Sequence, residues 1–554
     1  MENQVKVFVF IIISIGLLFV WDSFINIHHD DVSNNDVVVD KSNKIKKANA
    51  TDLDTTDLDV APQAQTISSH QTEDFAFDNV KGKIDLDSAS ISTLELTKYF
   101  TTIKQEKALQ LLFPQSSNKE SLISSGFILQ NYKKDKNTHW VVNKKSSKKL
   151  QLKYIVSSSV YILKDITFNS DYTLTVNDTI FNKSNKTLEM LKYARITRSD
   201  NIEVNDMFIS HQGIVYGSKG ISEQVDYGDV KNKDSMKSDI TAGYLGFSTK
   251  YWLISMLVPD NKMHMQIMYD SKHDVYVLSD HSSVISVTPN GKFTSSQVFF
   301  IGPKEQHLLK QVGTKYNIKN LENTIDFGWF FFITKPLSNF LLWLYSLCGN
   351  FGVAIIIMTI CIRVIIYPLS YKSYASMAKM KVIQPKLQAL KERCGDDKRE
   401  YNIEVMKLYK QEKINPVSGC LPIFLQIPIL FSLYKVIFLS VDIRHEPFFG
   451  WIKDLSFMDS SNIFTLFNLI PWDAGKLHIG ILPIIMGITI YLQQKLSGST
   501  MTDPVQKRIM SFFPVILTVV LASFPSGLMI YWITSNIIAI LQQLYIKHKF
   551  AKVK

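Results

Sequence analysis

The chain has 554 residues, of which 46% are hydrophobic and 20% charged, and its formal net charge is +11. That length exceeds one ordinary core, so at least two domains are expected. Residues 1–324 hold 37 basic and 37 acidic side chains, whereas residues 325–554 hold 24 basic and 13 acidic ones among long apolar runs. This pattern is typical of positive-inside membrane topology and contact with anionic lipid, and it argues against a nucleic-acid-binding protein.

The first apolar run covers residues 5–21. No small-x-small cleavage site comes after it, so we expect an uncleaved signal anchor within residues 1–27, with a cleaved signal peptide as the alternative. Under either interpretation the next part of the chain is exported. Residues 28–75 are rich in Asp, Asn, Ser and Thr, which predicts a flexible linker.

Residues 76–324 predict an exported β-sandwich domain. Runs of β-branched and aromatic residues, such as 153–163 and 251–258, alternate with Asn, Asp, Gly and Ser turns, and repeated short strands favour a sandwich. The domain contains no phosphate-binding loop, HExxH motif or nucleophile elbow. The four cysteines of the chain match no zinc or redox spacing: Cys348, Cys361, Cys394 and Cys420. We therefore expect no enzymatic activity, no cofactor and no metal.

Residues 325–346 are aromatic and apolar but are interrupted by Lys335 and Pro336. Because proline disfavours a straight span and aromatic side chains suit the headgroup layer, we expect an amphipathic helix on the outer membrane face. A membrane span is the alternative.

The run at residues 351–369 is long enough to cross a bilayer as a helix, and we expect it to end at Pro368. Arg363 lies inside this run, and no predicted span contains an Asp or Glu. An arginine well inside a span costs about 2.5–3.5 kcal/mol on insertion scales. Arg363 is also only about five residues, roughly 8 Å, from the cytoplasmic end. Snorkelling to the inner headgroups is therefore the simpler alternative to a functional charge.

Residues 372–415 hold 11 basic and 6 acidic side chains and predict a cytoplasmic helical hairpin. Cys394 and Gly395 break the helical pattern, and Asp397 with Glu400 resembles a capping box that starts the second helix. We expect the apolar stripe of the first helix to pack against the second, with a partly exposed binding face as the alternative. The stripe consists of Met377, Met380, Ile383, Leu387 and Leu390.

Four further apolar runs are present, at residues 420–440, 477–494, 508–524 and 527–546. With the two earlier runs they predict an α-helical membrane protein of six transmembrane helices. Its membrane core covers residues 347–546, and a basic tail covers residues 547–554. Both ends and the hairpin lie in the cytoplasm, because that placement satisfies the charge bias.

Polar side chains recur within these runs, and polar residues in spans usually face a bundle interior or a water-filled cavity. They include Thr359, Gln426, Thr518, Ser523, Tyr531, Thr534, Ser535 and Asn536. Thr359 lies one turn from Arg363 on the same helix face. We predict a hydrated groove, open to the cytoplasm, that attracts acidic residues of another polypeptide and lowers the cost of moving polar segments across.

The segments that carry this pattern resemble the YidC-type membrane protein insertases of Gram-negative bacteria (the YidC/Oxa/Alb family). The likeness is strong over about residues 325–546, whereas the regions before it match in architecture alone. The matching segments are MAKMKVIQPKLQALKERCGDDKRE, NPVSGCLPIFLQIPIL, DLSFMD, TDPVQKRIMSFFPV and FPSGLMIYWITSN.

The resemblance implies a multi-pass protein of the inner membrane, with a five-helix core after a periplasmic domain. It implies insertion of nascent membrane proteins from the cytoplasm, alone or beside the Sec translocon, without ATP. The hairpin is implied to help receive the substrate. The ribosome and the signal recognition machinery are further candidate partners, and the basic flanks predict contact with anionic lipids.

By motif position, the resemblance also implies the roles of individual residues. Arg363 would lie in the groove, and Thr359 with the pair Tyr531 and Trp532 would contact the nascent span. Gln426, Leu430 and Met486 would lie at groove or slide positions. Leu430 replaces an expected aromatic residue, and Trp532 replaces a common tyrosine.

Two other classes of protein stay open from the residues alone. The same polar side chains could line a channel or a solute carrier, and the exported domain could make the protein chiefly a scaffold. A proton-coupled transporter is disfavoured because the predicted spans offer no carboxylate.

Overall fold

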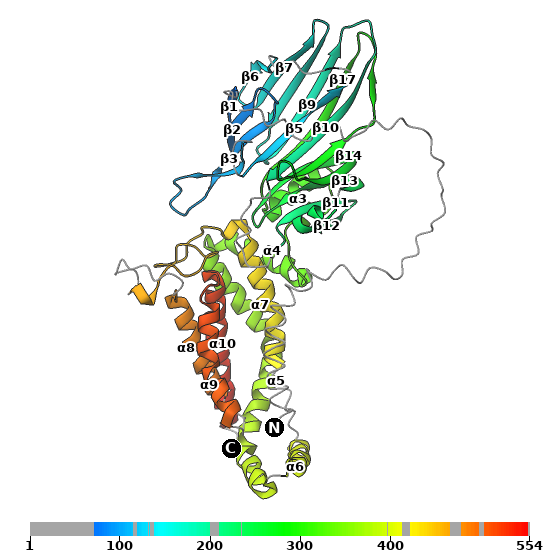
Figure 1. Ribbon diagram of the computed structural model, residues 1–554. Coiled ribbons are helices and arrows are strands. Elements are labelled where there is room, and N and C mark those ends of the chain that lie inside the picture. The colour runs from blue at the N-terminus through cyan, green and yellow to red at the C-terminus, as the bar shows by residue number, and fades with distance from the viewer. Residues whose placement is uncertain are drawn as a thin grey trace, which may run out of the picture. The chain divides into compact units, whose positions relative to one another are not determined.

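The computed structural model describes residues 71–114, 119–130, 132, 138–199, 210–233, 235–395, 397–412, 421–465, 478–497 and 504–551. These residues divide into two compact units that separate between Asp326 and Phe327 (Figure 1). The predicted anchor lies outside the described residues, as does residue range 28–70 of the predicted linker. The last residues of that linker belong to a strand instead, since β1 begins at Thr72.

The first unit is a β domain whose strand pairings are all antiparallel. It also carries the short helices α2 (Tyr227–Lys231) and α3 (Gln306–Lys315). Its strands are β1 (Thr72–Phe77), β2 (Val80–Asp85), β3 (Ile91–Phe100), β4 (Ala108–Leu112), β5 (Ser121–Leu129), β6 (Val141–Lys145), β7 (Lys149–Ser157), β8 (Val160–Phe168), β9 (Thr173–Asn182), β10 (Leu188–Ser199), β11 (Gly213–Ser218), β12 (Ile221–Val225), β13 (Met236–Ser248), β14 (Trp252–Asp270), β15 (Val275–His281), β16 (Ile285–Val287) and β17 (Lys292–Pro303).

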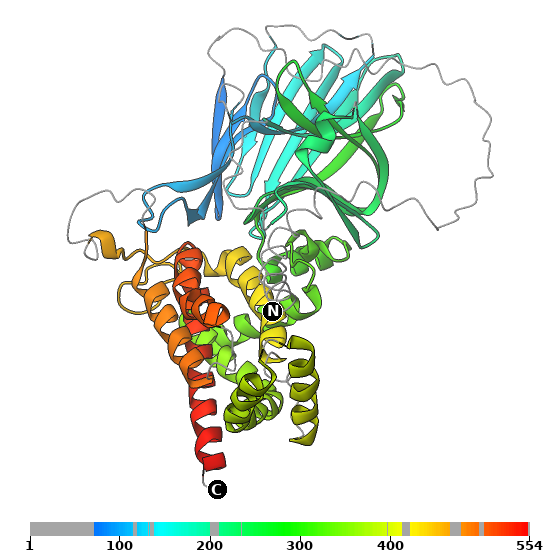
Figure 2. The same cartoon turned by 60° about the horizontal axis from the view of Figure 1, so that its bottom comes forward.

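The long strand β14 divides the sheet into two branches. Its first part pairs with β17 and its last part with β15, while β13 runs along its other edge. One branch continues from β17 through β9, β8 and β7 to β6. The other continues from β15 through β10, β5, β3 and β2 to β1. Figure 2 shows the broad curved sheets that result.

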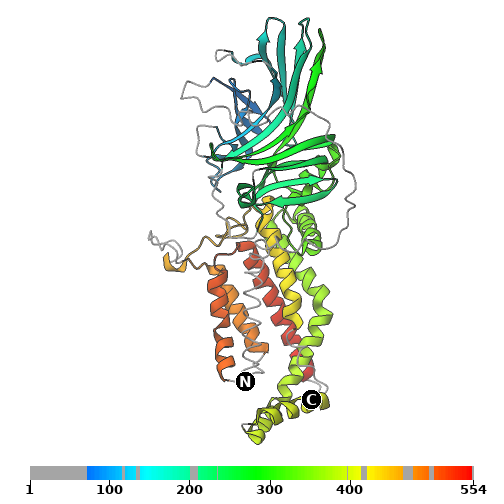
Figure 3. The same ribbon diagram turned by 45° about the vertical axis from the view of Figure 1, so that its right-hand side comes forward.

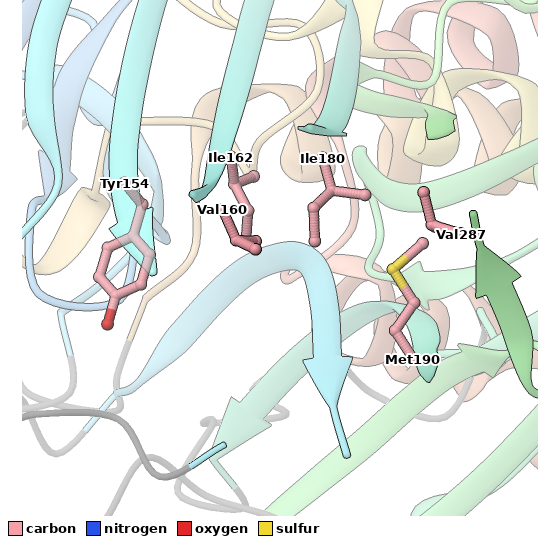
Figure 4. Packing of buried hydrophobic residues seen from close by; sticks show 6 residues of the cluster. All are labelled: Tyr154, Val160, Ile162, Ile180, Met190 and Val287. Carbon is pink, nitrogen blue, oxygen red and sulfur yellow. The ribbon is translucent and has the colours of Figure 1, made fainter. Parts of the chain in front are cut away.

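The two branches pack face to face. Residues of β8 alternate strictly between buried and partly exposed positions, because successive side chains of a strand point to opposite faces. The buried side chains of β7, β8 and β9 meet those of β10 and β16 in a single cluster (Figure 4), which comprises Tyr154, Val160, Ile162, Ile180, Met190 and Val287. The apolar runs of the sequence thus build a two-layered β domain.

A buried ion pair interrupts this apolar interior. Lys164 of β8 and Asp178 of β9 are cross-strand neighbours, each 1% exposed, with the ammonium nitrogen 2.6 Å from a carboxylate oxygen. The Lys164 ammonium also donates to the Ser125 carbonyl at 2.8 Å, and the Ser125 hydroxyl donates to Asp178 at 2.6 Å. Because Ser125 lies on β5, this polar cluster joins the two layers.

The second unit is a helical bundle. Helix α10 packs against α5, α8 and α7, while α4 packs against α5 and α7, and α9 packs against α8 (Figures 1 and 3). The helices are α4 (Phe331–Cys348), α5 (Phe351–Cys394), α6 (Lys398–Gln411), α7 (Leu421–Leu439), α8 (Ile481–Ser497), α9 (Pro504–Leu521) and α10 (Ser526–Ala551).

Two helices of the described residues are long and apolar enough to cross a membrane, at Phe351–Met380 and Ser526–Lys549. Three shorter apolar helices lie at other predicted spans, over Gln426–Leu439, Ile481–Leu496 and Met510–Leu521. The helical unit therefore contains apolar helices at five of the predicted spans, and the six-span count remains a prediction.

Helix α5 does not end at Pro368, so that prediction is wrong. The helix runs for 44 residues, through Pro368 and Pro385, to a break at Gly395. Proline removes one backbone hydrogen bond and bends a helix, but the turns on either side can continue it. One helix therefore connects the predicted span to the hairpin.

Helix α4 carries Pro336 inside it. Its buried residues recur at helical spacing and include Thr334 and Leu341, while Phe331, Phe332 and Trp343 are exposed. The helix thus has one buried and one exposed face, and an amphipathic helix at the outer membrane surface stays a prediction.

The hairpin of α5 and α6 is held by apolar packing and a cap. Met380, Ile383 and Leu387 of α5 form a cluster with side chains of α6, so the predicted packing between the two helices is confirmed. The Asp397 carboxylate caps α6 by accepting from the backbone amides of Arg399 and Glu400, at 2.9 and 3.0 Å.

Replacing Asp397 with alanine should loosen α6. Two amides of its first turn would lose their acceptor, which costs about 1 kcal/mol for a typical N-cap. Hydrogen exchange of the amides of residues 398–411 should therefore accelerate roughly fivefold, while exchange in the β domain stays unchanged. Asp397→Asn, which keeps an acceptor oxygen, should retain most of the protection. Equal protection in the alanine variant would contradict the role of the cap.

Candidate functional site

Arg363 lies in the contact between α5 and α10. Its side chain is 8% exposed, and its Nε donates to the Ser535 hydroxyl at 2.8 Å, with Nη2 donating to the same oxygen. Ser535 is near the middle of the candidate span Ser526–Lys549. An arginine that snorkels would extend toward the end of its helix, so this contact favours a charge held inside the bundle.

The charge of Arg363 has no acidic partner among the residues that the structure describes. A guanidinium carries five N–H donors in a planar fork. Within the same described residues, Ser535 is the hydrogen-bond acceptor found for it. The arrangement thus leaves donors with which a carboxylate or carbonyl group from another chain could pair.

A second hydrogen bond joins α7 to α10 close to Arg363. Tyr531 lies one turn before Ser535 on α10, is almost completely buried, and accepts a hydrogen bond from the Gln426 side-chain amide of α7. Thr359 lies one turn before Arg363 and is fully buried, with its hydroxyl donating to the Ile355 carbonyl at 2.6 Å. Three of the predicted site residues, Arg363, Thr359 and Tyr531, are therefore buried, and Gln426 is partly buried beside them. These four polar or charged groups lie on three adjoining helices.

The other predicted site residues differ in exposure. Met486 of α8 is fully buried, whereas Leu430 of α7 and Trp532 of α10 are partly exposed. The two exposed side chains could meet a passing apolar segment directly. Contact of any of the three with a nascent chain stays a prediction.

Sequence reasoning missed a second polar contact, between α10 and α8. The Asn536 amide donates to the Thr489 hydroxyl at 3.0 Å, and that hydroxyl donates to the Met486 carbonyl at 2.7 Å. Both side chains are buried. Thr489 lies in the predicted span 477–494, so the rule that selected Thr359 could have found it. Adjacent residues of α10, Ser535 and Asn536, thus bind different neighbouring helices.

The loop before α8 positions that helix. Asp459, 1% exposed, accepts from the Leu482 amide at 2.8 Å and from the Ser461 amide at 3.0 Å. It also accepts from the Trp451 indole at 3.1 Å. A carboxylate at a helix N-terminus satisfies free amides and complements the helix dipole. Asp459 therefore sets where α8 begins, and with it the position of Thr489.

Replacing Asp459 with alanine should destabilise the bundle by about 2–3 kcal/mol, because buried amides would lose their acceptor. Thermal unfolding of the detergent-solubilised protein, followed by near-ultraviolet circular dichroism, measures this. Asp454→Ala in the same loop is a suitable comparison, since it removes a carboxylate that accepts from Ser456 and His445 but from no residue of α8. A smaller loss for Asp459→Ala than for Asp454→Ala would contradict the assignment.

Comparison with known families divides the chain within α4, shortly after the boundary of the two units. Residues 74–340 match the family model described as the YidC periplasmic domain, and residues 343–553 match the one described as the 60Kd inner membrane protein. Together these two matches cover most of the chain.

Curated relatives match this chain over most of its length and over most of their own. The membrane protein insertase YidC of Brucella suis biovar 1 is 38% identical over 84% of this chain and 78% of its own. That of Rickettsia bellii is 35% identical over 98% of this chain and 99% of its own. A crystal structure of an active YidC insertase, with its first transmembrane domain resolved, covers 86% of this chain and 92% of that chain, at 18% identity and a TM-score of 0.38.

Proposed function

Because this chain belongs to the YidC family of membrane protein insertases, we propose that the charge of Arg363 acts directly on the nascent membrane proteins that the insertase inserts. The observation that carries the proposal is a buried guanidinium with one hydroxyl acceptor and no carboxylate partner among the described residues. The names of the relatives do not favour a channel or a solute carrier.

The proposed action of Arg363 is electrostatic. A nascent segment that must leave its acidic residues outside has to carry them through an apolar layer, where an unpaired charge is costly. A fixed cation can pair transiently with an acidic side chain at that point. The free-energy cost of desolvating the cation is already part of the folding free energy, so it is not paid again during insertion. The acidic group would compete with the Ser535 hydroxyl for the guanidinium fork, because a charge-assisted hydrogen bond is stronger than a neutral one.

Neighbouring residues would guide the apolar part of the same segment. Leu430 and Trp532 are partly exposed on helices that flank the buried polar cluster. We propose that they contact the nascent span, while Gln426, Tyr531 and Thr359 offer hydrogen bonds to its backbone or polar side chains. Met486 would act indirectly, because its backbone carbonyl accepts the hydrogen bond that holds the Thr489 hydroxyl in place.

We propose the predicted topology for the whole chain. Six helices cross the inner membrane, both termini are cytoplasmic, the β domain lies in the periplasm, and α4 lies at the outer surface of the bilayer. The surplus of 11 positive charges after residue 325 supports this placement. The Sec translocon, the ribosome, the signal recognition machinery and anionic lipids are proposed partners.

Insertion into vesicles tests the proposed function. A short single-span substrate is added to protein-free vesicles and to vesicles containing the purified insertase, and the protease-protected fragment is quantified. We expect the insertase to raise the yield severalfold, and more for a translocated tail with two aspartates than for the same tail with two asparagines. Equal yields from the two tails would reject the electrostatic role of Arg363. Equal yields with and without protein would reject insertion under these conditions.

A further inference from the structure

A pocket lies among α5, α8 and α10, well away from Arg363 along the bundle. It is lined by Tyr374, Met377 and Ala378 of α5, by Leu496 of α8, and by Gln543, Ile546 and Lys547 of α10. Tyr374 comes 11 residues after Arg363, and Ile546 comes 11 residues after Ser535. Each interval corresponds to roughly 16 Å of helix. The pocket therefore lies near the C-terminal ends of both candidate spans, at the cytoplasmic boundary in the proposed topology.

The pocket has a mainly apolar floor, and one lysine lines it. Its floor consists mainly of Met377, Leu496 and Ile546, while Lys547 belongs to the lining itself. The Lys549 ammonium lies 5.6 Å from the Tyr371 ring centroid, which holds this side chain beside α5. Lys372, Lys379 and Lys495 flank the lining residues and are exposed.

Acidic residues are absent from the same helical segments. Residues 371–391 of α5, and all of α8 and α10, contain no Asp or Glu, and the structure describes each of these segments. The C-terminus of α8 adds a fractional negative charge of about half a unit, which the full charges of several lysines outweigh. The pocket thus combines an apolar interior with a net positive opening.

We propose that this pocket binds one anionic phospholipid of the cytoplasmic leaflet. The first part of an acyl chain would lie on the floor of Met377, Leu496 and Ile546, and Lys547 and Lys549 would pair with the headgroup phosphate. Basic pockets between membrane helices on the cytoplasmic side suit such headgroups. A lipid fits better than an acidic peptide or free phosphate, because it alone supplies both an acyl chain and an anion at this depth.

The bound lipid would also connect three helices that carry the polar contacts described above. It would touch α5, α8 and α10 at one end, while Arg363, Thr489, Ser535 and Asn536 join the same helices nearer the middle. The proposal concerns lipid binding and goes beyond nascent-chain insertion. Its test therefore measures lipid adducts without any substrate protein.

Photo-crosslinking from the pocket tests the proposal. The full-length protein with Met377→benzoylphenylalanine is reconstituted in phosphatidylcholine vesicles that contain a minority of phosphatidylglycerol, and adducts are identified by mass spectrometry. We expect phosphatidylglycerol to exceed its vesicle share among the adducts by about fivefold or more. Leu541→benzoylphenylalanine is the positional control, because Leu541 is 60% exposed on α10; its adducts should match the vesicle composition.

Two kinds of variant separate charge from shape. Lys547→Gln with Lys549→Gln should return the adducts at position 377 to the vesicle composition, whereas Lys410→Gln on α6 should leave the enrichment intact. Ala378→Phe, which fills the pocket without changing its charge, should reduce total lipid adducts severalfold. Inorganic phosphate should reduce the enrichment no more than sodium chloride at equal ionic strength. Adducts at the vesicle composition in the unaltered protein, adducts to protein alone, or displacement by phosphate would each overturn the proposal.

Discussion

Replacing Arg363 with alanine is expected to lower the insertion of a substrate with an acidic translocated tail by roughly tenfold or more. A charge pair within a low-dielectric bundle needs to contribute only about 1.4 kcal/mol to the barrier for that factor. A substrate with a neutral tail should lose much less, because it makes no pair with the guanidinium. The measurement is the protease-protected yield in vesicles that contain equal amounts of each variant.

Three controls separate charge from geometry at this position. Arg363→Lys should retain most of the activity, since charge rather than fork geometry is proposed to act. Ser535→Ala leaves the charge in place and removes its acceptor, so it should not abolish the preference for the acidic tail. Arg363→Gln should behave as the alanine variant does. A lysine variant as weak as alanine, or an alanine variant that loses both substrates equally, would contradict the mechanism.

Replacing Lys164 with methionine is expected to destabilise the β domain by about 3–5 kcal/mol. The change leaves the Asp178 carboxylate, 1% exposed, without its cation in an apolar interior, and breaking one side of a buried pair is strongly destabilising. Urea unfolding of a fragment covering residues 71–326, followed by far-ultraviolet circular dichroism, would measure the loss. Lys149→Met serves as a comparison, because its pair with Asp165 is far more exposed, at 50% and 21% of the two side chains, and its loss should cost less than about 1 kcal/mol.

The double variant Lys164→Met with Asp178→Leu should recover most of that stability. Replacing a buried ion pair by apolar residues of similar volume is often neutral, since both desolvation costs disappear together. The recovery should be incomplete, because Ser125 would lose its hydroxyl acceptor and the Ser125 carbonyl would lose the ammonium donor. A double variant as unstable as the single one would show that packing, not uncompensated charge, dominates at this place.

Several features of the chain could be predicted from its sequence because they act within one helix or strand. The apolar runs that became α5 and α10, the cap of α6 by Asp397 and the alternating strands of the β domain all reflect local periodicity. Arg363 was identifiable for a similar reason, since a lone charge in a run of apolar residues is visible without knowledge of its neighbours. The residues could also show that no acidic partner exists within the predicted spans.

Local patterns were misleading where one element continues beyond its usual stop. Pro368 is an ordinary helix-ending signal, yet α5 continues through it for another 26 residues to Cys394. The proline costs one backbone hydrogen bond, whereas the packing of α5 against α6 around Ile383 stabilises the continued helix. Ile383 is distant from the proline in sequence. A helix-termination rule that considers only neighbouring residues in the sequence does not include that contact.

The amino-acid sequence by itself determined which segments are apolar, where helices can be capped, how the basic residues are distributed between the apolar runs, and that Arg363 lies inside one of those runs. Only the tertiary structure decided that Arg363 donates to Ser535, that Asn536 donates to Thr489, that Lys164 pairs with Asp178, and that a pocket including Lys547 forms beside Met377. The physical reason is that propensity and periodicity depend on neighbours along the chain. A contact between helices or strands depends instead on their rotation and relative shift, which are settled when all the elements pack together.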